Sequence, residues 1–165
     1  MKLDAVEAIA SALNKHGVRF LVVEGLAVAA HGYLRYTADV DMVIQLHPAN
    51  IREAFAALAD VGYRPSVPVT GQQFGDRLLR EQWIADKGMV VLNFWSDRYR
   101  DTPVDVFVVE PFDFEAEYNN GLLQELAPGL VLRFPQLETL IQMKLSAGRP
   151  KDLNDVEYLR KSQSA

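Results

Sequence analysis

The stretch that decides the fold is Val22-Val23-Glu24-Gly25-Leu26-Ala27-Val28-Ala29-Ala30-His31-Gly32-Tyr33-Leu34-Arg35-Tyr36-Thr37-Ala38-Asp39-Val40-Asp41. It begins at the end of a run rich in β-branched and aromatic residues, 18–23, which predicts a buried strand. A glycine then opens a short helix, and a polar connection leads to a second predicted strand, residues 39–45. A strand-to-helix turn presents backbone N–H groups and the positive end of a helix dipole to an anion. The stretch therefore predicts a phosphate site at Gly25, although a plain turn also needs glycine for its backbone alone.

Two acids begin the second predicted strand. Asp39 and Asp41 are two residues apart, so a strand would direct both side chains to the same face of a sheet. Two close carboxylates repel each other unless a proton or a cation neutralises them, and their hard oxygen atoms suit Mg²⁺ or Mn²⁺. The pair therefore indicates a metal site, and the alternative is an edge strand whose two acids both lie in water.

A third acid lies in a later apolar run. Asp105 stands within residues 103–109, where a carboxylate is costly to bury unless it is paired or bound to metal. If this strand lies beside the strand of Asp39 and Asp41, three carboxylates meet. Strand alternation also permits an outward-facing Asp105 with the neighbouring valines in the core.

The remaining elements predict a mixed sheet covered by helices rather than a strictly alternating parallel fold. Their order places all of residues 1–165 in one domain, with C-terminal helices in 135–160 packed on the sheet. The expected helices are a first one ending before Gly17, then 26–30, 48–61, 72–86, 135–147 and a last one starting near Asp152. The expected strands are 18–23, 39–45, 63–67, a pair at 89–95 and 104–109, and two weak ones near Leu122 and Leu130.

Composition narrows the functional classes. The 165 residues include no cysteine, which excludes disulfides, thiolate zinc sites and cysteine nucleophiles. A net charge of -5 argues against a broad surface that follows nucleic-acid phosphates. The N-terminus lacks a signal segment, and the apolar runs are too short to span a membrane. We therefore expect a soluble, unprocessed, cytoplasmic protein without a membrane partner.

The stretch from Gly25 to Asp41 resembles the signature of the polymerase-beta-like nucleotidyltransferase superfamily, above all its AbiEii-like and MNT-like bacterial branches. These branches occur in toxin-antitoxin and phage-defence systems. The signature is a Gly-Gly or Gly-Ser turn, a helix, Asp-x-Asp or Asp-x-Glu, and a third carboxylate on a later strand, which Asp105 matches. The segment 144–155 is similar to the second conserved block of that branch. The resemblance covers residues 18–159 and implies an α/β (α+β) nucleotidyltransferase fold.

The resemblance also implies a reaction and a set of site residues. A nucleoside monophosphate would pass from an NTP to an acceptor hydroxyl on a protein, a tRNA or a small molecule. Mg²⁺ or Mn²⁺ would be held by Asp39, Asp41 and Asp105, the last of which would also take the acceptor's proton. The implied nucleotide-binding residues are Gly25, Arg35, Thr37 and Lys144. Arg35 and Thr37 could equally be exposed surface residues, and Lys144 a lysine that extends its ammonium group to solvent.

Glu24 departs from the family pattern, because it stands where the first glycine of the turn is usual. A carboxylate about 4 Å from a triphosphate would cost about 4 kcal/mol at an effective dielectric of about 20. That penalty would weaken binding roughly a thousandfold. The enzyme hypothesis thus has an alternative, a catalytically weakened binding module such as an antitoxin that holds a partner protein.

Overall fold

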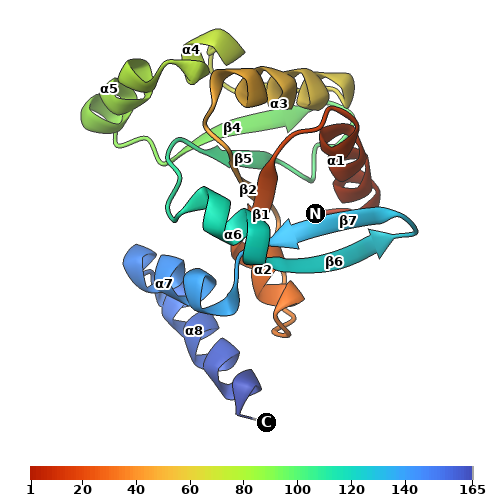
Figure 1. Cartoon of the computed structure of the whole chain (residues 1–165), viewed down its shortest axis with the longest axis vertical. Coiled ribbons are helices and arrows are strands. Elements are labelled where there is room, and N and C mark those ends of the chain that lie inside the picture. Colours follow the sequence, from red (N-terminus) through yellow and green to blue (C-terminus); the bar gives the residue numbers. More distant parts are fainter. Residues whose placement is uncertain (165) are drawn as a thin grey trace.

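The computed structural model describes residues 1–164 (Figure 1). Its strands are β1 (Phe20–Val23), β2 (Val40–Ile44), β3 (Tyr63–Pro65), β4 (Val91–Ser96), β5 (Val104–Phe107), β6 (Leu122–Ala127) and β7 (Leu130–Phe134). Its helices are α1 (Leu3–Lys15), α2 (Glu24–Ala30), α3 (Pro48–Asp60), α4 (Gly71–Gly75), α5 (Arg77–Lys87), α6 (Phe114–Asn120), α7 (Leu137–Ala147) and α8 (Pro150–Gln163).

A five-stranded sheet in the order β1-β2-β5-β4-β3 forms the centre of the molecule. Strands β2 and β5 are parallel, whereas β1, β4 and β3 each run antiparallel to the strand beside them. Strands β6 and β7 form a separate antiparallel hairpin whose strand β7 contacts β1. This mixed sheet flanked by helices confirms the predicted fold class, and β4 and β5 are the antiparallel pair that the sequence predicted.

Both faces of the central sheet are covered. One face belongs to the main core, in which Val40, Met42 and Val106 pack with residues of α1 and α3. The other face carries a smaller cluster, in which Val43 packs with Phe114 of α6 and Met143 of α7. Because side chains alternate along a strand, Asp41 and Asp105 leave the sheet on this second face, toward α7.

The C-terminal helices stand together at one end of the molecule. Helices α7 and α8 contact each other, and α7 also contacts α2 (Figure 1). Gly148, in the left-handed conformation with φ 65°, ends α7 and allows the chain to turn into α8. The pair thereby lies beside the strand-to-helix turn that the sequence singled out.

The structure differs from the sequence-based expectations in two elements and, by one or two residues, in most boundaries. The single helix expected at 72–86 is two helices, because the Asp76 side chain accepts hydrogen bonds from the backbone of α5 and starts a new helix there. Helix α6 was not predicted. Strand β2 starts at Val40, so Asp39 precedes the strand, and α8 starts at Pro150 rather than near Asp152.

No helix among the described residues combines the length and the apolar character that crossing a membrane requires.

Candidate active site

Three carboxylates meet where β2 and β5 run side by side. Asp41 of β2 stands directly opposite Asp105 of β5 in the parallel register, and Asp39 lies just before β2. One oxygen atom from each carboxylate lies within 4.8 Å of the other two. The structure therefore brings together the three acids that the sequence predicted as one group.

The electrostatics of this group indicate a site that accepts positive charge. Burial, together with the nearby charges of Asp105, Glu24 and Asp39, raises the pKa of Asp41 to about 7. Burial also raises the pKa of Asp105. Three oxygen donors from carboxylates form the ligand set that hard divalent cations prefer, so these residues fit Mg²⁺ or Mn²⁺.

Asn93 on β4 orients the third carboxylate. Its side-chain amide donates a hydrogen bond to Asp105 Oδ1 at 2.8 Å, while its own oxygen accepts one from the Ser66 hydroxyl. The bond to Asp105 lowers the pKa of that carboxyl and thereby opposes the effect of burial. Sequence reasoning missed Asn93, although a polar residue in an otherwise apolar strand was a usable signal.

The turn between β1 and α2 touches the loop that carries Asp39. A Cβ atom on Gly25 would lie only 2.4 Å from Thr37 Oγ1, so a side chain at this position would collide with Thr37. The Thr37 hydroxyl also contacts the backbone oxygen of Asp39 at 3.5 Å. Glycine at position 25 thus lets the turn approach the loop that presents the first acid.

Lys144 lies behind the cavity wall rather than on it. Its side chain is fully buried, and its ammonium contacts Glu24 at 2.6 Å, Asp155 at 3.0 Å and Asp152 at 3.2 Å. Burial alone would lower the pKa of Lys144, but hydrogen bonds to Glu24 and Asp155 raise it above its ordinary value. The alternative of an ammonium that reaches solvent is wrong, and direct contact between Lys144 and a nucleotide stays a prediction.

Glu24 is accordingly a paired carboxylate. Besides Lys144, the guanidinium of Arg149 lies 3.7 Å from its Oε2 atom, and its side chain is only 15% exposed. The expected repulsion of a triphosphate assumed a Glu24 charge without partners. Lys144 and Arg149 offset that charge, so Glu24 would repel a bound triphosphate less than expected.

Arg35 is held by one acid of α8. Its guanidinium makes two hydrogen bonds to Asp155, at 2.7 and 2.8 Å, a forked geometry that also raises the pKa of Arg35. Although its side chain is mostly buried, Arg35 still borders the cavity. Arg149, fixed by Asp152 at 2.6 Å, and Lys151 border the same cavity and were not predicted as site residues.

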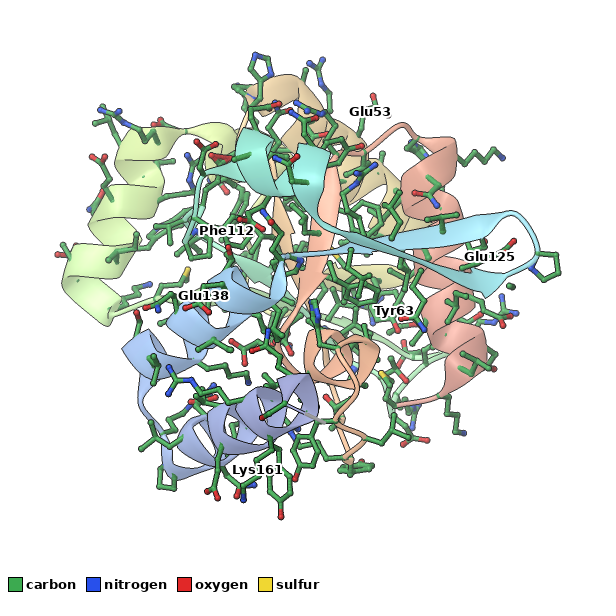
Figure 2. The ribbon with its side chains drawn as sticks, turned by 60° about the horizontal axis from the view of Figure 1, so that its bottom comes forward. Glu53, Tyr63, Phe112, Glu125, Glu138 and Lys161 are labelled. Atoms are coloured by element: carbon green, nitrogen blue, oxygen red, sulfur yellow. The ribbon has the colours of Figure 1, made fainter. Side chains whose placement is uncertain are left out.

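These residues surround a cavity of about 1020 Å³, large enough for a drug-sized ligand. Gly25, Thr37 and the three aspartates lie on its wall. Its basic residues are Arg35, Arg149 and Lys151. Phe107, Pro111 and Phe112 form an apolar side, and Glu138, Thr139 and Gln142 of α7 form a polar side. Figure 2 labels Phe112 and Glu138, which belong to these two sides.

The sequence model of a protein family described as "Nucleotidyltransferase of unknown function (DUF6036)" matches residues 1–161. The chain belongs to this nucleotidyltransferase family. The match confirms the nucleotidyltransferase assignment, while the AbiEii-like and MNT-like branch stays a prediction. No curated protein matches the sequence.

Two solved structures share the fold of this nucleotidyltransferase. A solution structure of the antibiotic-resistance factor ANT(2'')-Ia has a TM-score of 0.62 and 15% identity, and the match covers 98% of this chain and 83% of the other. A crystal structure of ANT(2'')-Ia in complex with adenylyl-2''-tobramycin has a TM-score of 0.61 and 13% identity, with 98% and 88% covered. At such low identity the likeness concerns the fold alone.

Proposed function

We propose that this nucleotidyltransferase moves a nucleoside monophosphate from an NTP to an acceptor hydroxyl with the help of Mg²⁺ or Mn²⁺. The observation that carries the proposal is the convergence of Asp39, Asp41 and Asp105 within 4.8 Å on the wall of a 1020 Å³ cavity. Bound divalent cations would neutralise these carboxylates and offset the negative charge of the phosphates. Asp39, Asp41 and Asp105 would all be their ligands.

Asp105 would also act on the acceptor. The acceptor oxygen forms a bond to the α-phosphorus, the bond from that phosphorus to the pyrophosphate oxygen breaks, and the hydroxyl proton passes to Asp105. One feature supports this role: the hydrogen bond from Asn93 holds one oxygen of Asp105 in place.

The other end of the cavity would hold the phosphates. The Gly25 turn offers backbone N–H groups at the start of α2, and Thr37 offers a hydroxyl beside it. Arg35 and Arg149 are each paired with an acid of α8, but both border the cavity, where N–H groups not used in those pairs would donate hydrogen bonds to the departing pyrophosphate. The ion pair of Glu24 with Lys144 favours this enzyme over the weakened binding module, because it offsets the charge on which that alternative depended.

We further propose a small molecule as the acceptor. The cavity continues from the three acids to the apolar side at Phe112 and the polar side at Glu138, which gives room for a second ligand beside the nucleotide. ANT(2'')-Ia, which shares the fold, was crystallised with adenylyl-2''-tobramycin, a nucleotidylated small molecule. A tRNA end and a partner protein of a toxin-antitoxin pair are the other acceptors to test.

Calorimetry with each of the four NTPs and Mg²⁺ tests nucleotide binding without knowledge of the acceptor. The wild type should bind at least one NTP in a saturable, metal-dependent manner. Asp39→Ala and Asp41→Ala should weaken that binding by about 100-fold or more, because each removes a charged metal ligand. Asp86→Ala, which removes an exposed acid of α5, is the matched control and should bind as the wild type does.

Binding that is absent from the wild type, or that survives both aspartate substitutions, would refute the proposal. If binding is found, labelled NTP is then incubated with the protein and with pools of small hydroxyl compounds, tRNA or candidate partner proteins. Label transferred to the small-molecule pool supports the proposed acceptor class. Label transferred only to tRNA or protein contradicts that class but leaves the nucleotidyl transfer intact.

A further inference from the structure

Glu24 has an unusual backbone conformation at the start of α2. Among residues 1–164 it is the one non-glycine residue with a positive φ, at 56°. This left-handed region favours glycine, since a Cβ atom crowds the following carbonyl group there. A residue with a side chain stays in such a conformation only when its surroundings hold it, and such positions gather at functional sites.

An ion pair of the Glu24 side chain holds the backbone in this conformation. Its carboxylate reaches the buried ammonium of Lys144 at 2.6 Å, and Lys144 completes its contacts with Asp155 and Asp152. An ammonium group has three protons to donate, and here three carboxylates face it. Glycine at position 24 would relieve the backbone but leave Lys144 without its shortest contact.

The same contacts close a ring around the site. From Glu24 the ring passes through Lys144 of α7 to Asp155 of α8, and from Asp155 to Arg35. Two residues beyond Arg35, Thr37 rests against Gly25, the residue that follows Glu24. The loop that presents Asp39 is thus fastened at one end to the turn and at the other to the C-terminal helices.

We propose that Glu24 and Lys144 are a pair of positioning residues that fix the phosphate-binding turn and the Asp39 loop through the buried ion pair. Neither side chain needs to touch the nucleotide for this role. The inference rests on the proposed function only where it concerns nucleotide binding. Glu24 thereby supports nucleotide binding, whereas its charge alone was expected to hinder it.

The sign of one substitution separates the two views. Glu24→Gln keeps the shape of the side chain and removes its charge. If Glu24 merely repels phosphate, this change tightens Mg²⁺-dependent NTP binding in calorimetry. If Glu24 positions the site, binding weakens by about tenfold. A loss of this size is typical when a residue that orients metal ligands is removed.

A double-mutant cycle tests whether the two residues act together. Lys144→Met should also weaken NTP binding. The double variant with Glu24→Gln should bind no more weakly than Lys144→Met alone, because Lys144→Met already removes the contact that Glu24→Gln would weaken. Effects that add in full would mean that Lys144 acts on the nucleotide by itself and would overturn the pairing.

Amide hydrogen exchange supplies a measurement that needs no nucleotide. In Glu24→Gln, the amides of His31, Gly32 and Tyr33, which are hydrogen-bonded to the backbone of α2, should exchange at least about fivefold faster than in the wild type, because the ring no longer restrains the loop. The amides of α3 should keep their protection. Glu115→Gln, which breaks an exposed ion pair with Arg19 outside the ring, is the control and should leave the exchange of residues 31–33 unchanged.

Should Glu24→Gln fail to fold, Glu24→Gly replaces it, since glycine suits the left-handed backbone and equally removes the carboxylate. Unchanged exchange at residues 31–33, or tighter NTP binding by either variant, overturns the proposal. A wild type that binds no NTP but whose loop loosens in the variant defeats the proposed function and supports the positioning role. The two ideas can therefore fail separately.

Discussion

The ionised carboxylate of Asp41 destabilises the metal-free fold, and a bound cation would remove that effect. In the metal-free fold, burial and the nearby Asp105 raise its pKa from 3.8 to about 7. An acid whose folded-state pKa is raised holds its proton more tightly folded than unfolded, so stability falls as pH rises through that window. Above pH 7 the ionised Asp41 therefore destabilises the metal-free protein, and a bound divalent cation would remove this cost.

Asp41→Asn should consequently stabilise the metal-free protein, and more so at higher pH. In EDTA the gain in unfolding free energy should grow from about pH 4 to pH 7 and then level off, at roughly 2–4 kcal/mol. Urea denaturation at a series of pH values measures it. Added Mg²⁺ should stabilise the wild type and narrow the gap at pH 8, and a gap independent of pH would contradict the argument.

The sequence could specify the three acids but not their partners. The spacing of Asp39 and Asp41, with Asp105 in an apolar run, follows from local rules of strand geometry and charge burial. Contacts such as Glu24 with Lys144 join residues 120 positions apart, and their existence depends on how helices pack. The left-handed backbone of Glu24 was equally hidden, because the residue type gives no sign of it.

At the scale of elements, long periodic segments were predictable and short ones were not. Helix α3 has proline at its first position and glycine after its end, and it was predicted with nearly correct bounds. Helix α6 has seven residues, too few for an apolar period to stand out. Its Asp113 cap, which accepts a hydrogen bond from the Ala116 backbone, was a signal that could have been used.

The missed helix α6 fixes the start of α7. Glu117 of α6 is buried, and its carboxylate accepts hydrogen bonds from the backbone of Gln136 at 2.8 Å and the hydroxyl of Thr139 at 2.6 Å. It thereby satisfies a donor at the beginning of α7, the helix that forms the polar side of the cavity.

Glu117→Gln should therefore lower the unfolding free energy by about 1–2 kcal/mol, because an amide accepts weaker hydrogen bonds and turns a donor toward a donor. Chemical denaturation measures the loss. Glu115→Gln, two residues earlier on the exposed side of the same helix, should cost clearly less. Equal losses of unfolding free energy for both variants would show that the buried hydrogen bonds of Glu117 contribute no more than an exposed ion pair.

At the scale of the whole molecule, some ionic contacts are lost in acid and others in alkali, so the free energy of unfolding should fall on both sides of neutral pH. Burial alone would raise the pKa of Asp152 and Asp155, but hydrogen bonds from Arg149, Arg35 and Lys144 hold these carboxyls below their ordinary value. Their contribution is therefore present near neutral pH and lost as the pH falls through the lowered pKa. Strong acid should therefore weaken the junction between α8 and the rest of the fold.

His16 makes a contribution to stability that is lost at alkaline pH. It joins the end of α1 to α3 through contacts with Glu53 at 3.0 Å and Asp60 at 2.7 Å, and these hydrogen bonds raise its pKa above 6.5. A base with a raised folded-state pKa contributes its full stability below the unfolded value and loses it as the pH rises through the folded value. His16→Gln should accordingly lower the urea midpoint at pH 6 and leave it unchanged at pH 9. In the Glu53→Gln/Asp60→Asn background the same substitution should have no effect at either pH, whereas a gap that widens toward pH 9 would mean that His16 is neutral in the fold.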